Sequence, residues 1–286
     1  MTRAVWLVLA GIASVQLGAA VAKDLFDRVD PTALVWLRLV ASAVLLLALA
    51  RPRLRGRSRG DWQVVAGFAL TLAVMNWAFY QSFARLPLGV AVTIELIGPL
   101  AVALAGSRRV RDLLWVLLAG IGVTALGWER TALDPVGVAY AVLAGTGWAC
   151  YILLSAQTGR RWPGLDGLSV ASAGGALMLA PFALAADLHG LLDPQVLALG
   201  ALIGLLSSVI PYSFELIALR SLRPSVFGIL MSVEPAAAAL AALLVLGESL
   251  SVLQWTAIGC VVAASAGATL FTQTSHDRDT TVLPAA

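Results

Sequence analysis

The segments IELIGPLAVAL (residues 94–104) and LMSVEPAAAAL (residues 230–240) are apolar runs that each carry a proline at the same place, Pro99 and Pro235, 136 residues apart. Gly98 precedes the first proline and Glu234 the second. A proline inside a membrane helix leaves a backbone carbonyl without its partner where no water can replace it. Paired interruptions in corresponding segments of two halves indicate the binding site of a membrane carrier.

Apolar segments of this kind fill the 286-residue chain. Hydrophobic residues make up 60% of it and charged residues 12%, with a mean hydropathy of +0.90, which excludes an ordinary soluble domain. Most segments approach the roughly 20 residues that a helix needs to cross a bilayer. The sequence therefore predicts an all-α membrane protein with ten spans, at residues 4–22, 32–50, 63–84, 88–106, 113–128, 135–157, 166–186, 195–219, 224–246 and 252–271.

The basic residues divide unequally between the two sides of the predicted membrane. With the N-terminus in the cytoplasm, 14 arginines fall on the cytoplasmic side, and only Lys23, Arg28, Arg85 and Arg130 on the other. Because Lys and Arg are enriched in cytoplasmic connectors, both termini are expected on the cytoplasmic side of the membrane. The net charge of +3 therefore reflects topology and contact with lipid headgroups, and we expect no nucleic-acid partner.

Two features have competing interpretations. Arg3, the apolar run after it and the Ala20-Val21-Ala22 ending imitate a signal peptide, but cleavage would leave nine spans. Cys150 and Cys260 lie in separate spans without a CxxC or Cys/His cluster, so packing is favoured over a disulfide, and no metal or cofactor is expected.

Shifting the sequence by 136 residues superposes further pairs, among them Gly11 with Gly147 and Leu86 with Leu222. Each half would hold five spans, at residues 4–128 and 135–271, followed by a disordered cytoplasmic tail at 272–286. Because five is odd, the second half would enter the membrane in the opposite orientation, as inverted repeats do in alternating-access carriers.

Few ionisable groups lie well inside the spans, and such groups should face a cavity or the bundle interior. Helical spacing places Asn76 with Tyr80, and Pro211 with Glu215, on shared faces. The candidate substrate-binding residues are Gln16, Arg38, Asn76, Tyr80, Glu95, Tyr151, Tyr212 and Glu215. Glu215 and Glu95 are the candidates for proton coupling, because a carboxyl group in an apolar site can exchange a proton near neutrality. The candidate hinge positions are Pro99, Pro211, Glu234 and Pro235.

Structural roles stay open for several of these residues. Glu95 and Glu215 are also compatible with fixed interhelical hydrogen bonds or a pair with Arg38. For Glu234, the structural alternative is a hydrogen bond to the backbone groups that Pro235 leaves without partners. For the tyrosines, the alternative is packing alone.

Several of these segments resemble a known family. They include Leu37-Arg38-Leu39, Met75-Asn76 with Phe79-Tyr80, Glu95 through Gly98-Pro99, Trp148-Ala149 with Tyr151, Pro211-Tyr212-Ser213 with Glu215, and Ser232 with Glu234-Pro235-Ala236. In order and spacing they resemble the drug/metabolite transporter superfamily with two EamA-type repeats, and within it the threonine/homoserine exporter group. The resemblance implies ten helices in a bacterial inner membrane and proton-driven export of small amino acids from the cytoplasm.

The residue types suit a zwitterionic substrate. Glu95 or Glu215 would face its ammonium group, and Arg38, Asn76 or a helix N-terminus its carboxylate. A broad drug or metabolite exporter remains the alternative, favoured by an aromatic cavity without a carboxylate. A membrane enzyme is disfavoured because neither histidine lies in a span, and a channel because no ring of like charges appears.

Overall fold

The computed structural model describes residues 2–105, 112–126, 133–186, 188, 190–219 and 230–280, and every regular element within them is helical. The elements are α1 Thr2–Asp24, η1 Leu25–Asp27, α2 Pro31–Ala50, α3 Arg59–Phe83, α4 Leu88–Glu95, α5 Ile97–Ala105, α6 Asp112–Leu126, α7 Pro135–Arg161, α8 Asp166–Ala185, α9 Pro194–Gly204, the π-helix η2 Leu205–Val209, α10 Ile210–Leu219, α12 Glu234–Leu246 and α13 Val252–Thr280.

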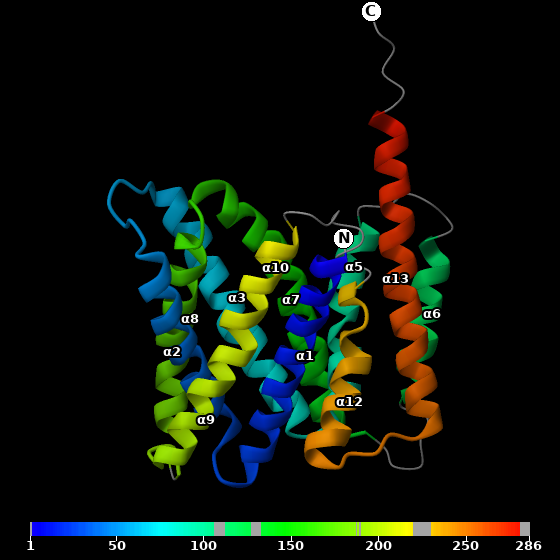
Figure 1. Cartoon of the computed structure of the whole chain (residues 1–286), viewed down its shortest axis with the longest axis horizontal. Coiled ribbons are helices and arrows are strands. Elements are labelled where there is room, and N and C mark those ends of the chain that lie inside the picture. The colour runs from blue at the N-terminus through cyan, green and yellow to red at the C-terminus, as the bar shows by residue number, and fades with distance from the viewer. Residues whose placement is uncertain are drawn as a thin grey trace, which may run out of the picture.

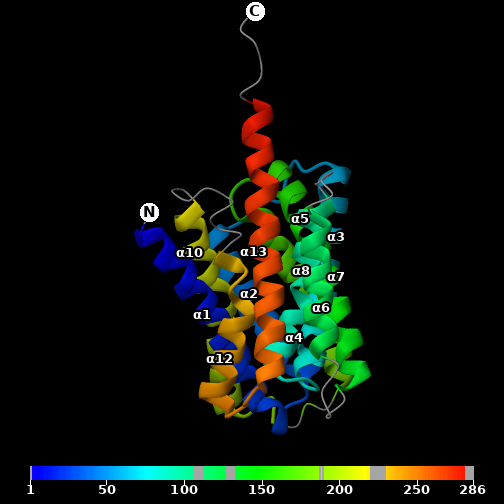
Figure 2. The ribbon, with the colours of Figure 1, turned by 90° about the vertical axis from the view of Figure 1, so that its right-hand side faces the viewer.

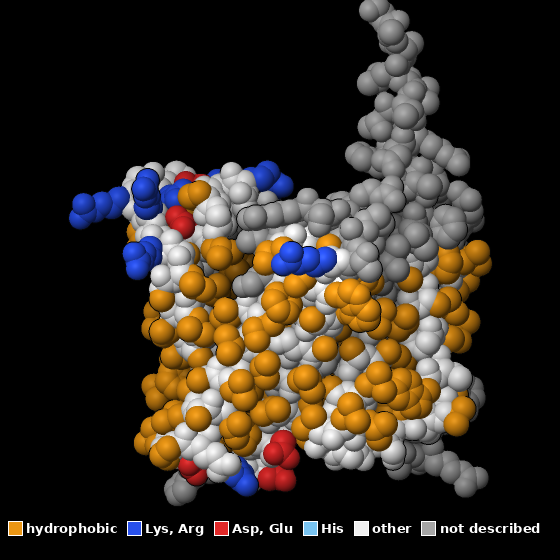
Figure 3. Space-filling model, in the orientation of Figure 1, with side chains coloured by type: hydrophobic (Ala, Val, Ile, Leu, Met, Phe, Trp, Pro, Cys, Tyr) orange, Lys and Arg blue, Asp and Glu red, His pale blue; other side chains and the backbone are white. Residues whose placement is uncertain are grey.

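The helices form one bundle whose axes run roughly side by side (Figures 1 and 2). By length and composition, five of the described helices could cross a membrane: Arg3–Asp27, Pro31–Ala50, Arg59–Phe83, Pro135–Arg161 and Asp166–Ala185. An apolar belt covers the helices in Figure 3, with Lys and Arg side chains gathered at the end where the α2–α3 connector lies. The N-terminal end of α1 lies at this same end (Figure 1), which we call the arginine-rich end.

Three helices begin with the same sequence signal at the opposite end of the bundle. Asp30, Asp134 and Asp193 each precede a proline that opens α2, α7 or α9. Each aspartate side chain accepts a hydrogen bond from a first-turn N–H, and the proline occupies a position where no N–H is needed. These Asp-Pro pairs explain why the helices start where the apolar runs begin.

Helices from the two halves of the chain pack against each other throughout the bundle. α1 packs on α10 and α12, α3 on α7, α2 on α8 and α6 on α13. Small residues permit the close approach: a Cβ on Gly89 of α4 would lie 2.8 Å from the Cβ of Ala239 in α12. Because lipid is as apolar as the helices themselves, such close backbone packing is what holds membrane helices together.

Three of the predicted spans are interrupted. Residues 88–106, predicted as one span, form α4 and α5 with a turn at Leu96, three residues before Pro99. A second turn at Ser232 and Val233 precedes α12, and residues 224–229 of the predicted span 224–246 lie outside the described residues. In span 195–219, the π-helix η2 separates α9 from α10 and ends two residues before Pro211.

The C-terminal helix differs from the expected boundary. α13 runs to Thr280, so residues 272–280 are helical where the sequence predicted the beginning of a disordered tail. The helical hydrogen bonds simply continue past the last apolar residues, and hydropathy gives no signal for that. Residues 281–286 lie outside the described part of the chain.

A partly buried ion pair lies at the end of the bundle opposite the arginine-rich end. Lys23, at the end of α1, forms an ion pair with Glu248 and donates a 2.6 Å hydrogen bond to the carbonyl of Leu86. Glu248 also accepts a 3.0 Å hydrogen bond from the N–H of Leu88, the first residue of α4. One lysine and one glutamate therefore connect α1, the α3–α4 connector and the segment after α12.

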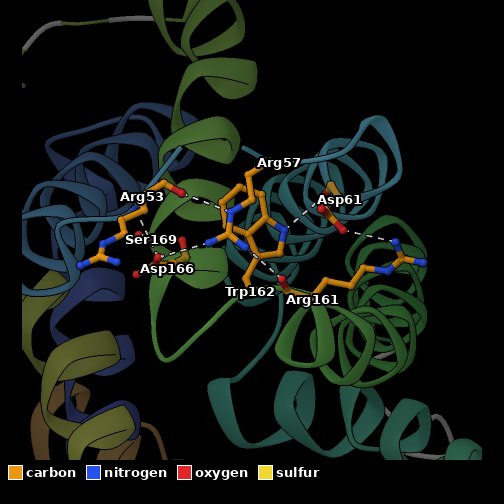
Figure 4. Close-up of polar contacts among 7 residues, drawn as sticks. All are labelled: Arg53, Arg57, Asp61, Arg161, Trp162, Asp166 and Ser169. Atoms are coloured by element: carbon orange, nitrogen blue, oxygen red, sulfur yellow. Dashed lines mark hydrogen bonds and ion pairs between the residues drawn. The ribbon is translucent and has the colours of Figure 1, made fainter. Parts of the chain in front are cut away.

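A cluster of polar contacts connects the two halves at the arginine-rich end (Figure 4). The Arg57 guanidinium lies over the Trp162 ring, 4.3 Å from its centroid, and 3.6 Å from a carboxylate oxygen of Asp166. Arg161 pairs with Asp61 at 3.3 Å on the other side of the tryptophan. The α2–α3 connector is thereby held against the end of α7 and the start of α8.

Candidate functional site

A cavity of about 170 Å³ lies inside the bundle between the two halves of the chain. We call it the central cavity. It is lined by Val15, Gln16, Ala19, Arg38, Met75, Asn76, Phe79, Tyr80, Val92, Glu95, Trp148, Tyr151, Ser207, Pro211, Met231 and Glu234. Polar and charged groups thus meet aromatic walls in an otherwise apolar protein.

Arg38 and Glu95 are charged residues of opposite sign on this wall. The Arg38 guanidinium carbon lies 5.7 Å from the centroid of the Tyr80 ring, and its charge is within electrostatic reach of Glu95. Within the described residues these two side chains form no ion pair shorter than 4.0 Å. The simplest structural role considered for Arg38, a direct pair with Glu95, is therefore absent from this arrangement, and both charges border the same cavity.

Several buried polar atoms beside the cavity have unused hydrogen-bonding capacity. Among the described residues, Gln16 Oε1, Arg38 Nε and the Tyr80 hydroxyl have no hydrogen-bond partner. Asn76 is anchored differently, because its Nδ2 donates a 2.8 Å hydrogen bond to the carbonyl of Leu72. Buried polar groups without partners are costly, so these three atoms are well placed to bind a polar solute.

The interruption between α4 and α5 determines where Glu95 sits. Glu95 is the last residue of α4, only 7% exposed, and Pro99 has no N–H to offer its carbonyl. The backbone there packs directly on α7: a Cβ on Gly145 would lie 2.7 Å from the Glu95 carbonyl oxygen. A Cβ on Gly98 would likewise collide with the Gly145 carbonyl. Two glycines thus allow the broken helix to reach α7 and present Glu95 to the cavity.

The second interruption supplies the other acidic residue. Glu234 opens α12, is 6% exposed and lines the cavity, with Pro235 as the next residue. The turn before it is held by a 2.8 Å hydrogen bond from Ser232 to Ser265 of α13. Both paired segments therefore bring a buried glutamate to one cavity, although only the first was predicted to bind substrate.

The structure places most, but not all, of the predicted site residues at the central cavity. Six of the eight substrate-binding candidates line the central cavity: Gln16, Arg38, Asn76, Tyr80, Glu95 and Tyr151. Tyr212 and Glu215 belong to α10, but their side chains lie outside the described part of the structure. Of the four hinge candidates, Pro211 and Glu234 line the cavity, whereas Pro99 and Pro235 are not among its lining residues.

Sequence reasoning missed most of the apolar wall. Val15, Ala19, Met75, Val92 and Met231 line the cavity but are unremarkable inside apolar runs. A signal was nevertheless present in the repeat. Shifts of 136 residues relate Val15 to Tyr151, Met75 to Pro211 and Glu95 to Met231, and all six of these residues line the cavity.

An apolar helical bundle around a small cavity that holds one arginine and two glutamates defines a multi-pass membrane protein able to bind a polar solute. The chain belongs to the EamA-like transporter family, which matches residues 135–270.

Proteins described as "Threonine/homoserine exporter RhtA" from Escherichia coli and Salmonella typhimurium are each 39% identical to this chain over 274 residues, 93% of it and 92% of theirs. A protein of known crystal structure superposes with a TM-score of 0.65 at 16% identity, covering 96% of this chain and 99% of that one, which establishes the fold alone. As a member of a transporter family, the protein is not an enzyme.

Proposed function

We propose that this protein exports small amino acids of the threonine and homoserine type across the inner membrane, with the central cavity as the substrate site. The observation that carries the proposal is the meeting of Arg38 and Glu95 on one buried wall. A zwitterion needs a cation for its carboxylate and an anion for its ammonium group, and these side chains supply both. The names of the RhtA relatives support this substrate class.

The size and chemistry of the cavity favour this substrate class over the broad drug or metabolite exporter. At about 170 Å³, the cavity is smaller than the roughly 300–1,000 Å³ of pockets that hold drug-sized ligands. It also contains carboxylates, Glu95 and Glu234, whereas a broad exporter of apolar drugs was expected to have an aromatic cavity without them.

Alternating access by two inverted five-span repeats is the mechanism that we infer. Exchanging the two halves of the chain converts the contact of α3 with α7 into that of α10 with α1, and the contact of α5 with α7 into that of α12 with α1. Both pairs of contacts are present, and the central cavity receives residues from equivalent positions of both halves. This two-fold pattern supports ten crossings, with both termini on the cytoplasmic side.

The test is efflux of preloaded radiolabelled threonine from proteoliposomes, with and without a proton gradient directed against it. We expect gradient-stimulated efflux that homoserine competes and that Glu95→Gln abolishes. Cys150→Ala is the matched control, because Cys150 is exposed on α7 beside the cavity residue Tyr151. Absence of threonine movement in the folded protein would contradict the proposed substrate class.

Threonine–threonine exchange identifies the carboxyl group that carries the coupled proton, because exchange needs substrate binding but no net proton movement. A glutamine at the coupling position should preserve exchange and lose the stimulation by the gradient. We expect this behaviour from Glu215→Gln. Glu95→Gln should instead abolish exchange together with efflux, because it removes the anion that the substrate ammonium group needs. Equal stimulation by the gradient in wild type and Glu215→Gln would refute a coupling role for Glu215. Exchange that survives in Glu95→Gln without stimulation would assign the coupling proton to Glu95 instead.

A further inference from the structure

A second cavity, of about 150 Å³, lies between α3, α7 and α8, closer to the arginine-rich end than the central cavity. We call it the outer cavity. Its walls are formed mainly by Phe68, Tyr151, Ser155, Thr158, Trp162 and Gly167. Tyr151 lines the central cavity as well, so one side chain borders both spaces.

A single face of α7 connects the two cavities. Trp148, Tyr151, Ser155, Thr158 and Trp162 are spaced by three or four residues, which places them in one stripe along the helix. The first lines the central cavity, Tyr151 lines both, and the last three line the outer cavity. The stripe therefore runs without interruption from the buried site to the arginine-rich end.

The outer cavity contains a buried hydroxyl group without a partner. Thr158 is 3% exposed, and its Oγ1 has no hydrogen-bond partner among the described residues. Ser155, one turn away, already donates its hydroxyl to the carbonyl of Ile152 at 3.1 Å. Because a buried hydroxyl without a partner is costly, Thr158 is suited to receive a polar group that enters the cavity.

Trp162 is fixed by polar and stacking contacts at the arginine-rich end of the outer cavity, and Tyr151 forms the partition between the two cavities. Trp162 donates from Nε1 to the carbonyl of Asp61 at 3.3 Å and is covered by Arg57 (Figure 4). Tyr151 packs on Phe68 in a tilted contact with ring centroids 5.4 Å apart. Because Tyr151 borders both cavities, its side chain has to move for a solute to pass from one cavity to the other.

We propose that the outer cavity is a transit site, which receives a small hydroxyl-bearing amino acid from the arginine-rich end and passes it beyond Tyr151 to the central cavity. The inference rests on the proposed function and adds a second substrate site to it. Thr158 Oγ1 bonds a polar group of the substrate there. The residues that line this cavity carry no charge, so binding is weaker than in the central cavity.

The test uses single-cysteine reporters in a Cys150→Ala/Cys260→Ala background that still transports. Ser155→Cys reports on the outer cavity and Val15→Cys on the central one. A membrane-impermeant thiol reagent is added at the arginine-rich side, with and without threonine, and the rate of labelling is measured. Arg59→Cys, at an exposed position of α3, is the control that threonine should not protect.

We expect threonine to slow labelling at both reporters. Thr158→Val, which removes the hydroxyl and keeps the shape, should weaken protection at Ser155→Cys and leave it unchanged at Val15→Cys. Protection at Ser155→Cys should persist with Glu95→Gln, which disables the central site. Persistence would show that the outer cavity is occupied itself and is not merely closed by binding elsewhere.

Three results would overturn the transit site. In the first, threonine protects Val15→Cys but not Ser155→Cys. In the second, Thr158→Val leaves the protection at Ser155→Cys unchanged. In the third, protection at Ser155→Cys disappears with Glu95→Gln. The first of these leaves the proposed function standing. Absence of protection at both reporters would contradict the proposed function together with the transit site, so the two failures are distinguishable.

Discussion

Gly145→Ala tests how Glu95 is placed, because it adds one methyl group where α7 meets the interruption between α4 and α5. The new Cβ would lie 2.7 Å from the Glu95 carbonyl oxygen and 3.3 Å from its Cα, whereas ordinary van der Waals contact begins at 3.4 Å. The two backbones must therefore separate by about 0.7 Å, the difference between 3.4 and 2.7 Å. Both contacting groups are backbone, so no side-chain rotation can relieve the collision.

The expected cost follows from this displacement. Overpacking by one methyl group in a tight core destabilises a protein by about 1–3 kcal/mol. A binding group displaced by roughly 1 Å can lose on the order of a hundredfold in activity, so a shift of this size at Glu95 should raise the KM for threonine by about tenfold. We therefore expect both a lower Tm and a higher KM.

The assay is threonine efflux at varied substrate concentration, together with thermal unfolding of the purified protein. Gly259→Ala in α13 is the matched control, because a Cβ there meets nothing within 4 Å. Replacing glycine by alanine within a helix should stabilise this control by about 0.5–1 kcal/mol. A Gly145→Ala variant with the KM and Tm of the Gly259→Ala control would refute the packing argument.

Two further substitutions test the ends of the bundle. Lys23→Met removes the cation that pairs with the partly buried Glu248, and should lower the free energy of unfolding by about 3 kcal/mol. Adding Glu248→Gln to the same chain should partly restore this free energy. A Tm unchanged by Lys23→Met would contradict a stabilising ion pair. Arg57→Lys keeps the charge but loses the planar group stacked on Trp162, and should cost about 1 kcal/mol, measured by the same unfolding assay. If lysine and arginine give equal stability at this position, the stacking contributes nothing.

Polar residues in apolar runs were the part of the site that the sequence could predict. Burying Arg38, Gln16 or Glu95 against lipid is costly, so each had to face the bundle interior, where the cavity lies. The apolar residues of the wall, such as Met75 and Val92, carry no comparable signal, because they are equally acceptable against lipid. Their position depends on helix rotation, which tertiary packing determines.

The prolines predicted that helices would be interrupted, but not where. The turn falls at Leu96 and not at Pro99, because a proline removes the hydrogen bond to the carbonyl four residues earlier, and the distortion appears in that preceding turn. The π-helix η2 likewise lies in the turn before its proline, Pro211. The outer cavity had no sequence signal, since Thr158 and Ser155 are ordinary helical residues until their surroundings are known.

The two ends of the central cavity are closed very differently. Toward the Lys23 end, Tyr80 packs on Phe83 and Phe26 in an aromatic cluster with centroids 4.9–5.9 Å apart. Toward the arginine-rich end, Tyr151 on Phe68 separates it from the outer cavity. Under the proposed alternating access, this arrangement is the state that loads from the arginine-rich side. Release on the other side has to separate the aromatic cluster and the Lys23–Glu248 pair together, so these contacts set the balance between the two states.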